Sequence, residues 1–297
     1  MYVRVVAAAA TALLGAATLL LPSSDARARD VGDPPRAAVG PQVLAHRGAS
    51  AYAPENTLPA VDRAARLGAT WVENDVQRTK DGQLVVIHDD TLRRTTDARR
   101  VFPDRAPWKV RDFTAAEIAR LDAGSWFGAS FAGTRVPTLA GYLREVERNH
   151  QSLLLEIKNP ELYPGVERQI VKSLADQGWL DARHLDRRLV VQSFDVDSLR
   201  TVHALAPGLR TAYLGRPATA ELPAYASFTD GINPSYGSIS TAYVSAAHGF
   251  TGPHGRPLSV FTWTVNDADT TRRAVALGVD GIITNKPDVV RAALPGS

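Results

Sequence analysis

Eight short β-rich runs recur along the chain, and the stretch between each run and the next is long enough to hold a crossover helix. Parallel strands need connections of a dozen or more residues, whereas antiparallel strands can be joined by a tight turn. The runs are Val43–Ala45, Trp71–Gln77, Leu153–Ile157, Leu189–Gln192, Arg210–Leu214, Asp230–Asn233, Leu258–Trp263 and Gly281–Thr284. This spacing predicts an α/β fold built on eight parallel strands.

A ninth β-rich run, Leu84–Ile87, cannot be one of these parallel strands. Only a few residues around Asp81-Gly82 separate it from the preceding run, which is too short for a parallel crossover. It is predicted to fold back as a hairpin that brings His88 roughly opposite Asp75. In an eight-stranded parallel barrel the site is built at the C-terminal ends of the strands, which is where this hairpin would stand.

Residues typical of helix ends flank the first and the last predicted helix. Asn56-Thr57 offers an N-cap for a helix that has Pro59 in its first turn and ends at Leu67-Gly68. Asp267–Leu277 repeats this pattern before the last strand. The segment at about residues 90–135 lacks this alternation of strands and helices, so it is predicted to be an insertion of low helical content over the barrel mouth.

The first 28 residues have a composition of their own. Arg4 precedes an apolar run from Val5 to Leu21, and the small-x-small triplet Ala26-Arg27-Ala28 follows it. This order predicts a signal peptide over residues 1–28 and therefore a secreted protein, extracellular or periplasmic. The run is also long enough for a retained membrane anchor. Residues 29–41 are predicted to be a flexible leader, and residues 42–297 the barrel domain.

Composition excludes several classes of protein. The formal net charge is +3, from 34 basic and 31 acidic side chains that are mixed along most of the chain, so no nucleic-acid footprint is indicated. There is no cysteine, which excludes disulfides, zinc thiolate sites and cysteine nucleophiles. At 297 residues the chain is long enough to be stabilised by its core alone.

Three carboxylates fall on predicted strands. Glu73 and Asp75 stand two residues apart, so both side chains point to the same side, and Glu156 lies near the end of another apolar run. Carboxylates buried together repel one another unless a positive group lies between them. Oxygen ligands without thiols indicate a hard cation such as Ca²⁺ or Mg²⁺. Structural salt bridges to nearby Arg or Lys are the alternative, and a two-carboxylate glycosidase using Glu73 and Glu156 also fits the bare pattern.

Basic and imidazole side chains follow the same strands. His46 could act as a general acid or base, and Arg47 could grip a phosphate with two hydrogen bonds. His88 ends the hairpin strand, and a lone histidine there is more often a core or surface residue. Lys158 lies two residues after Glu156 and could neutralise charge on a phosphate or merely balance that acid.

The aromatic residues could contact a substrate or serve only in packing. Trp263 could contact a substrate's alcohol portion or plug the barrel core. The aromatics of the insertion could form its own small core or an apolar rim at the barrel mouth: Trp108, Trp126, Phe127 and Phe131. The remaining histidines lack clustered acids in the sequence and are expected to be solvated surface residues: His150, His184, His203, His248 and His254.

Short motifs follow one another along about residues 43–290. They are His46-Arg47-Gly48, Pro54-Glu55-Asn56-Thr57, Glu73-Asn74-Asp75-Val76-Gln77, Thr79-Lys80-Asp81-Gly82, Val86-Ile87-His88-Asp89, Leu155-Glu156-Ile157-Lys158, Gln192-Ser193-Phe194, Thr262-Trp263-Thr264-Val265-Asn266 and Thr284-Asn285-Lys286-Pro287-Asp288. Each motif is weak alone, but together and in this order they are a strong signal. They resemble the glycerophosphodiester phosphodiesterase family.

The resemblance implies a TIM (β/α)8 barrel with a small inserted subdomain after the second-strand hairpin. It implies an enzyme that hydrolyses glycerophosphodiesters to an alcohol and sn-glycerol 3-phosphate with one divalent cation, Ca²⁺ or Mg²⁺. Site roles carried over from the family are metal binding by Glu73, Asp75 and Glu156, acid–base catalysis by His46 and His88, phosphate binding by Arg47 and Lys158, and substrate contact by Trp263. The chain departs from the family at Asn74, where members usually carry an apolar residue that faces the helices.

Several alternatives stay open at this point. The same barrel site would suit a phospholipase D acting on lysolipids or sphingomyelin, with transient contact to a membrane surface. A secreted binding protein without turnover is a second alternative, although the presence of all the assigned residues argues against it. The reaction could pass through a cyclic phosphate or use direct attack by water. Neither the acid and base assignment of the two histidines nor the oligomeric state follows from the sequence.

Overall fold

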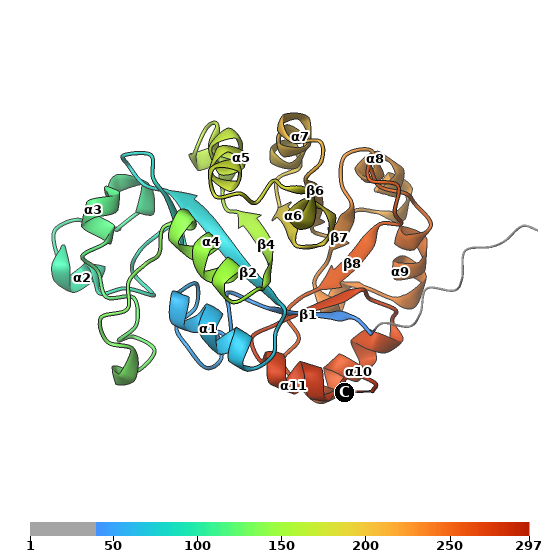
Figure 1. Cartoon of the computed structure of the whole chain (residues 1–297), viewed down its shortest axis with the longest axis horizontal. Helices are drawn as coiled ribbons and strands as arrows, with labels where there is room; N and C mark the ends of the chain where they lie inside the picture. The colour runs from blue at the N-terminus through green and yellow to red at the C-terminus, as the bar shows by residue number, and fades with distance from the viewer. Residues whose placement is uncertain (1–39, 297) are drawn as a thin grey trace, which may run out of the picture. The chain divides into compact units, whose positions relative to one another are not determined.

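A computed structural model of the chain describes residues 40–296 (Figure 1). The predicted signal peptide, residues 1–28, and nearly all of the predicted leader lie outside the described residues. Among the helices formed by residues 40–296, none has the length and apolar character needed to cross a membrane.

Eight parallel strands close into a barrel. They are β1 (Gln42–Ala45), β2 (Trp71–Arg78), β4 (Ser152–Ile157), β5 (Leu189–Ser193), β6 (Arg210–Leu214), β7 (Gly231–Asn233), β8 (Ser259–Thr262) and β9 (Gly281–Thr284). Each strand pairs with the next in this order, and β1 completes the ring by pairing with both β2 and β9. Each predicted run forms one strand of the barrel, so the prediction of a TIM barrel is confirmed.

Helices surround the strands as an outer layer (Figure 1). They are α1 (Leu58–Arg66), α4 (Leu139–Arg148), α5 (Val166–Asp176), α6 (Ala182–Arg187), α7 (Val196–Leu205), α8 (Leu222–Ala226), α9 (Thr241–His248), α10 (Ala268–Ala276) and α11 (Pro287–Ala292). Short 3-10 turns lie at Val110–Asp112, Ala129–Phe131, Pro160–Leu162, Thr219–Glu221 and Tyr236–Ser238. Asp267 caps α10 by accepting a hydrogen bond from the Thr270 N–H.

The pleat of the strands sorts apolar side chains into two layers. On β4, Leu154 belongs to the cluster inside the barrel, whereas Leu153 and Leu155 belong to the cluster between the sheet and the helices. This explains why β4 reads as a continuous apolar run, since a parallel strand is buried on both faces. The inner cluster also contains Leu44, Trp71, Val190, Ala212, Phe261 and Ile283.

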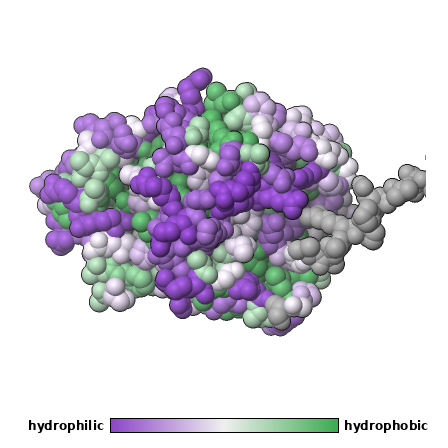
Figure 2. All heavy atoms as spheres, in the orientation of Figure 1, coloured by the Kyte–Doolittle hydropathy of each residue, from purple (hydrophilic) through white to green (hydrophobic). Residues whose placement is uncertain are grey.

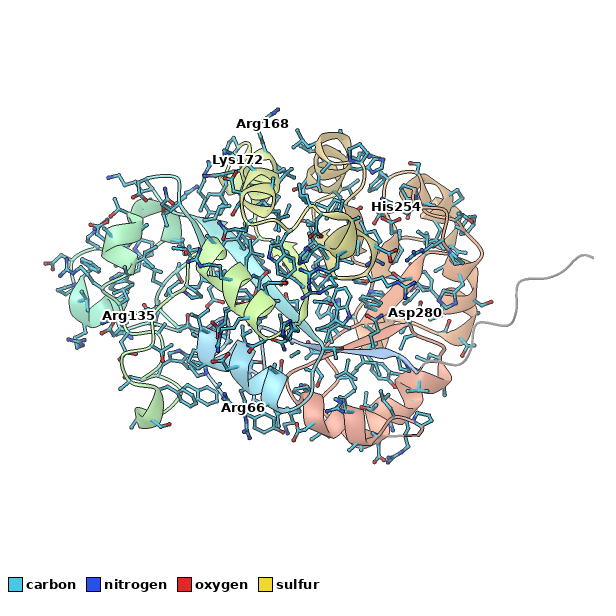
Figure 3. All side chains as sticks on the ribbon, in the orientation of Figure 1. Arg66, Arg135, Arg168, Lys172, His254 and Asp280 are labelled. Carbon is cyan, nitrogen blue, oxygen red and sulfur yellow. The ribbon has the colours of Figure 1, made fainter. Side chains whose placement is uncertain are left out.

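The outer helices show the matching one-sided pattern. On α5, Val166, Ile170 and Leu174 are buried against the barrel. Arg168 and Lys172 of the same helix are exposed and point away from it (Figure 3). Polar residues accordingly predominate over the middle of the face seen in Figure 2.

The hairpin forms, with a register that differs by one residue from the prediction. β3 (Leu84–Val86) pairs antiparallel with β2, and Val76 lies opposite Val86. The Gly82 N–H donates to the Thr79 carbonyl, and Gly82 has a φ of +83°, so the chain turns around Asp81 rather than between Asp81 and Gly82. The Ile87 N–H therefore donates to the Asp75 carbonyl, and His88 lies one residue beyond the position opposite Asp75, where the sequence had placed it only roughly.

The segment after the hairpin packs around a core of its own. It contains the helices α2 (Ala98–Val101) and α3 (Ala115–Ile118), which lie to one side of the barrel beyond α4 (Figure 1). Its fully buried side chains include Leu92, Phe113 and Leu121, which pack with Val85 of β3. Both helices have only four residues, in agreement with the low helical content expected for this segment.

The expectation that all five remaining histidines are solvated is wrong for His184. This side chain is 3% exposed and stacks on Trp179, with 4.5 Å between the ring centroids. Its Nδ1 lies 2.6 Å from Asp181 Oδ1, and its Nε2 lies 3.1 Å from Glu147 Oε2. Asp181 is the N-cap residue of the same helix, three positions before His184, whereas Glu147 lies on α4, so the contact with Glu147 could not be read from the local sequence.

Asn74 on β2 is buried without a hydrogen-bond partner. Its exposed fraction is 0%, and neither its amide nitrogen nor its amide oxygen contacts a partner among the described residues. Asn74 is paired in the β2–β4 register with Leu155, which belongs to the apolar layer under the helices. A buried amide that loses its bonds to water without replacing them lowers stability.

We predict that Asn74→Leu, which keeps the number of side-chain heavy atoms, raises the free energy of unfolding by about 1–2 kcal/mol. Gln77→Leu on the same strand is the matched control. The Gln77 amide donates to the Ile87 and His88 carbonyls and accepts from the Tyr163 hydroxyl, so its loss should lower that free energy by about 2–3 kcal/mol. Urea unfolding of both variants measures the two effects, and equal signs would contradict this account of Asn74.

Candidate active site

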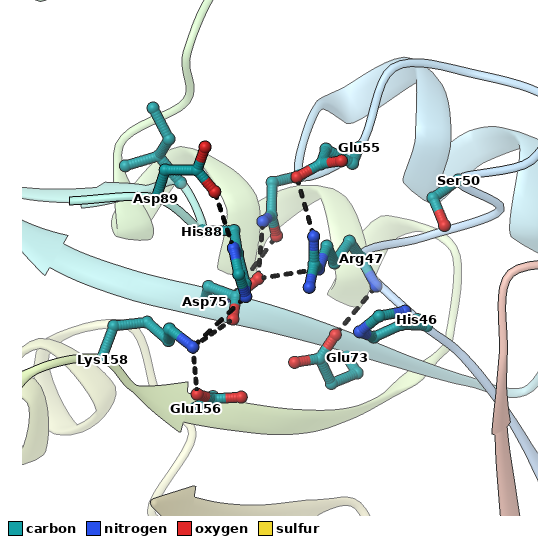
Figure 4. Close-up of polar contacts among 12 residues, drawn as sticks. His46, Arg47, Ser50, Glu55, Glu73, Asp75, His88, Asp89, Glu156 and Lys158 are labelled. Carbon is teal, nitrogen blue, oxygen red and sulfur yellow. Dashed lines mark hydrogen bonds and ion pairs between the residues drawn. The ribbon is translucent and has the colours of Figure 1, made fainter. Parts of the chain in front are cut away.

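Polar and charged side chains gather at the C-terminal ends of the barrel strands (Figure 4). They line a pocket of about 120 Å³. The pocket is lined by His46, Arg47, Glu73, His88, Glu156, Lys158, Gln192, Phe194, Leu214, Trp263, Thr264 and Ile283. The strand-end position is the one at which parallel α/β barrels build their sites. Asp75 lies beneath this lining and contacts Arg47 and Lys158.

Three acids form the floor of the site. Glu73, Asp75 and Glu156 are buried, and each offers a carboxylate oxygen within 4.8 Å of the others. The β2–β4 register pairs Asp75 with Glu156, which explains why acids more than eighty positions apart in the sequence meet. The structure therefore brings together the three carboxylates that the sequence selected.

Burial and mutual repulsion set the protonation of these acids. Burial, then the charges of Asp75 and Glu156, raise the pKa of Glu73 well above its ordinary value. Burial, then the charge of Asp75, raise the pKa of Glu156 to about 7. Burial acts in the same direction on Asp75, but the positive charges of Arg47, His88 and Lys158 hold its pKa below the usual range. Asp75 is thus the acid whose negative charge the surrounding cations favour most.

The donor set fits a hard divalent cation. Oδ1 of Asp75 is buried and has no hydrogen-bond partner among the described residues, and the nearby cation Lys158 holds its Nζ 3.8 Å away. The cluster consists of carboxylate oxygens alone, which are the ligands that Ca²⁺ and Mg²⁺ prefer. Salt bridges to Arg47 and Lys158 are also present, yet two cations leave three acids with one negative charge in excess. Salt bridges to these two cations therefore do not allow all three acids to ionise together, in agreement with the raised pKa of Glu73.

Arg47 is held in a fixed orientation by three acids. Its backbone N–H donates to Glu73 Oε2 at 2.8 Å, with φ at +58° in the left-handed region. Its Nη1 donates to Glu55 Oε1 at 3.0 Å, and its Nε lies 3.4 Å from Asp75 Oδ2. Gly48 follows with φ at +79°, and a Cβ there would come within 2.6 Å of the Ala60 backbone. The glycine of the His-Arg-Gly motif is thus required for close packing on α1.

His46 is oriented by an amide from the last strand end. Its Nδ1 lies 2.7 Å from Asn285 Oδ1, which also accepts a hydrogen bond from the Ser50 hydroxyl. Since an amide oxygen only accepts, Nδ1 carries the proton and Nε2 is left with its lone pair in the neutral ring. Burial, then the charge of Arg47, lower the pKa of His46 to about 4.

His88 lies on the other side of the acid cluster from His46 (Figure 4). Its Nδ1 lies 2.8 Å from Asp89 Oδ1, and its Nε2 lies 3.3 Å from Lys158 Nζ. Lys158 also forms an ion pair of 2.7 Å with Glu156 Oε1. β3 ends at Val86, so His88 is not part of the strand pairing. Its side chain can therefore lie beside Lys158 although the hairpin register differs by one residue from the prediction.

Trp263 forms part of an apolar wall of the pocket and also packs against the barrel interior. Its indole N–H donates to the Asn233 carbonyl at 2.8 Å, which fixes the ring. Phe194 meets it edge to face, with 6.0 Å between the ring centroids, and is 52% exposed. Trp263 thus packs on the barrel core and also lines the pocket, and its contact with a substrate stays a prediction.

Sequence reasoning assigned no site role to several residues that contact the site. Asn56, expected near a helix N-cap, instead has a φ of +59° and donates its amide to Asp75 Oδ2 at 2.7 Å. Thr57 is the N-cap residue of α1, but its hydroxyl donates to the Pro54 carbonyl rather than capping the helix. Glu55 and Asn285 orient Arg47 and His46. The only available signal was that these residues lie inside the motifs of the resemblance.

Comparisons with known proteins agree with this geometry. A model of the glycerophosphoryl diester phosphodiesterase family matches residues 46–289. A glycerophosphodiester phosphodiesterase of Caldanaerobacter subterraneus subsp. tengcongensis is 37% identical over 256 residues, which cover 84% of this chain and 95% of the relative. One from Bacillus subtilis is 34% identical over 267 residues, covering 85% and 86%.

A solved structure shares the fold. It is an Oleispira antarctica phosphodiesterase in complex with the product sn-glycerol-3-phosphate, with a TM-score of 0.70 and 28% sequence identity. The match covers 86% of this chain and 96% of that one.

We predict that a chelator-treated sample loses stability as the pH rises. The pKa of Glu156 is raised in the folded chain, so the stabilisation associated with its protonation is complete below pH 4.5 and is lost as the pH rises through about 7. The free energy of unfolding should fall on the order of 2–3 kcal/mol over this interval. Glu156→Gln should flatten the slope, and Glu161→Gln, at an exposed glutamate, should leave it unchanged. Urea unfolding between pH 4.5 and 8 measures both, and an identical slope in Glu156→Gln would exclude this origin.

Proposed function

This chain belongs to the glycerophosphoryl diester phosphodiesterase family and is a phosphoric diester hydrolase, and from that premise we propose that it hydrolyses glycerophosphodiesters to an alcohol and sn-glycerol 3-phosphate with a divalent cation. One observation carries the proposal. Three buried carboxylates meet two cationic side chains and two imidazoles around a single pocket. The Oleispira antarctica neighbour, solved with sn-glycerol-3-phosphate, supports the choice of product.

The charges of the site suit a phosphodiester, which carries one negative charge. Three acids with Arg47 and Lys158 sum to one negative charge, since −3 + 2 = −1. A divalent cation changes this sum to +1, which the diester monoanion would neutralise. A bound cation therefore gives the acid cluster and its two cationic neighbours the net positive charge that a diester monoanion requires.

Glu73, Asp75 and Glu156 are the residues that would hold the cation. When bound, it supplies Lewis-acid polarisation of a phosphoryl oxygen and stabilises the charge that develops there. Oxygen ligands suit both Ca²⁺ and Mg²⁺, so the proposal names a divalent cation of this class. The raised pKa values of Glu73 and Glu156 support it, because a cation is what allows these buried acids to ionise together.

We assign His46 as the general base and His88 as the general acid. The Asn285 amide keeps the proton on Nδ1 of His46, so Nε2 can accept a proton from the attacking hydroxyl. The Asp89 carboxylate orients His88, whose Nε2 would deliver a proton to the leaving alcohol. Lys158 must then turn from His88 to the phosphate, where it joins Arg47. Trp263 would cover the alcohol portion.

The direct test is product release from several head-group diesters, with and without a chelator. We expect sn-glycerol 3-phosphate from glycerophosphocholine and glycerophosphoethanolamine, a loss of at least about 100-fold with the chelator, and recovery with Ca²⁺ or Mg²⁺. Asp75→Asn should remain inactive after metal addition, while Asp176→Asn, at an exposed acid on α5, should behave as wild type. Activity that resists the chelator would overturn the metal requirement. Faster turnover of lysophosphatidylcholine micelles would favour a phospholipase D instead.

The acid and base assignment is tested by the leaving group. A good leaving group such as 4-nitrophenolate needs no proton, so His88→Ala should lose about 100-fold or more on glycerophosphocholine but little on glycerol 3-(4-nitrophenyl phosphate). His46→Ala should be slow on both, because the attacking hydroxyl still needs a base. His150→Ala, at an exposed histidine, serves as the control. The reverse ranking of His46→Ala and His88→Ala would exchange the two roles.

A further inference from the structure

Arg94 bridges two acids that each hold a residue of the site. Its Nε and Nη2 donate to Asp89 at 2.7 and 2.9 Å, and its Nη1 and Nη2 donate to Glu55 at 2.9 and 2.7 Å. Asp89 in turn contacts Nδ1 of His88, and Glu55 accepts from Nη1 of Arg47. One guanidinium thus closes a continuous chain of hydrogen bonds from one edge of the pocket to the other.

The three members of this bridge come from separate segments. Glu55 lies between β1 and α1, Asp89 directly follows the hairpin, and Arg94 belongs to the segment that packs beside the barrel. The neighbours of Arg94 in sequence are fixed in that segment's core, since Leu92, Thr95 and Thr96 are 0%, 5% and 7% exposed. The Thr96 hydroxyl further donates to the Leu92 carbonyl, which closes the backbone around Arg94. The guanidinium is therefore presented to the two acids by a rigid loop.

The charges explain why both acids need this cation. Without it, Glu55 and Asp89 would face each other as two carboxylates with only Arg47 and His88 to pair with. Glu55 would then compete with substrate phosphate for Arg47, and Asp89 would lose the contact that fixes its second oxygen. The hydrogen bonds that Arg94 donates to Glu55 and Asp89 accordingly raise the pKa of Arg94, and the hydrogen bonds that Asp89 accepts from His88 and Arg94 lower the pKa of Asp89.

We propose that Arg94 is a positioning residue for the hydrolysis, which orients His88 through Asp89 and Arg47 through Glu55. The proposal rests on the proposed function, because it is those two side chains that Arg94 places. A lysine cannot replace it, since only the planar guanidinium can donate in pairs to two carboxylates at once. The side chain of Arg94 is 43% exposed, and ion pairs at such positions contribute little to stability. Its removal should therefore affect catalysis much more than folding.

Arg94→Gln, Arg94→Lys and the control Arg93→Gln test this on glycerophosphocholine. Arg93 is the adjacent exposed arginine, and its side chain forms no hydrogen bond or ion pair with the described residues. We expect Arg94→Gln to lower kcat/KM by about 10- to 100-fold, through both a lower kcat and a higher KM, because misplacement of a reacting or binding group is costly. Arg94→Lys should recover little of this loss. Both variants should keep the Tm of Arg93→Gln within a few degrees.

Variants of the two acids separate the two arms of the bridge. Asp89→Asn should act mainly on kcat, through His88, and Glu55→Gln mainly on KM, through Arg47. In the Glu55→Gln, Asp89→Asn double variant, the further change Arg94→Gln should have almost no effect, because its partners are already altered. Wild-type kinetics in Arg94→Gln or full activity in Arg94→Lys would overturn the proposal. So would a loss on Arg94→Gln in the double variant that is as large as the loss in the wild-type background.

A second readout does not depend on the substrate. In ¹⁵N-histidine-labelled protein, the Nδ1 proton of His88, identified by its absence in His88→Ala, should be protected from exchange in wild type and Arg93→Gln. It should broaden or vanish in Arg94→Gln, and a protected signal there would overturn the positioning role. If wild type hydrolyses no glycerophosphodiester, the proposed function fails, and this NMR comparison still decides whether Arg94 orients His88.

Discussion

The repulsion among Glu73, Asp75 and Glu156 is the constraint on which the rest of the site depends. Three buried acids in contact are unfavourable in the folded chain unless positive charge and hydrogen-bond donors surround them. The surrounding structure supplies these groups from separate loops. Asn56 adopts a left-handed backbone to donate to Asp75, and the Arg47 N–H turns toward Glu73. The unusual backbone at the strand ends is thus explained by the need to compensate buried charge.

Much of the fold could be predicted because its causes are local and periodic. A parallel strand such as β4 is buried on both faces and reads as an apolar run, and the distance between runs separates crossovers from turns. The same logic placed Glu73 and Asp75 on one side of β2. Their meeting with Glu156 followed from the barrel, since adjacent parallel strands end at the same edge. Chemistry that depends on strand position was therefore accessible from the chain alone.

What could not be predicted depends on distant partners or on single residues. The hairpin register differed because a left-handed Gly82 shifts the turn to Asp81, and no periodicity reports that choice. The burial of His184 was missed because it depends on Glu147 and Trp179, which lie outside the helix that carries His184. Arg94 was missed because it lies in the one long segment without a βα rhythm. In that segment neither helix nor strand spacing says which side chain reaches the barrel.

The contact between His46 and Asn285 links the two ends of the described barrel. Its partners are 239 positions apart, and Asn285 directly follows β9, the strand that pairs with β1 to close the ring. During synthesis on a ribosome the acids of β2 and β4 emerge long before this amide does. An unfinished chain would thus hold its carboxylates while His46 still lacked its orienting partner. The closure of the ring between β1 and β9 is therefore also the step that brings Asn285 to His46.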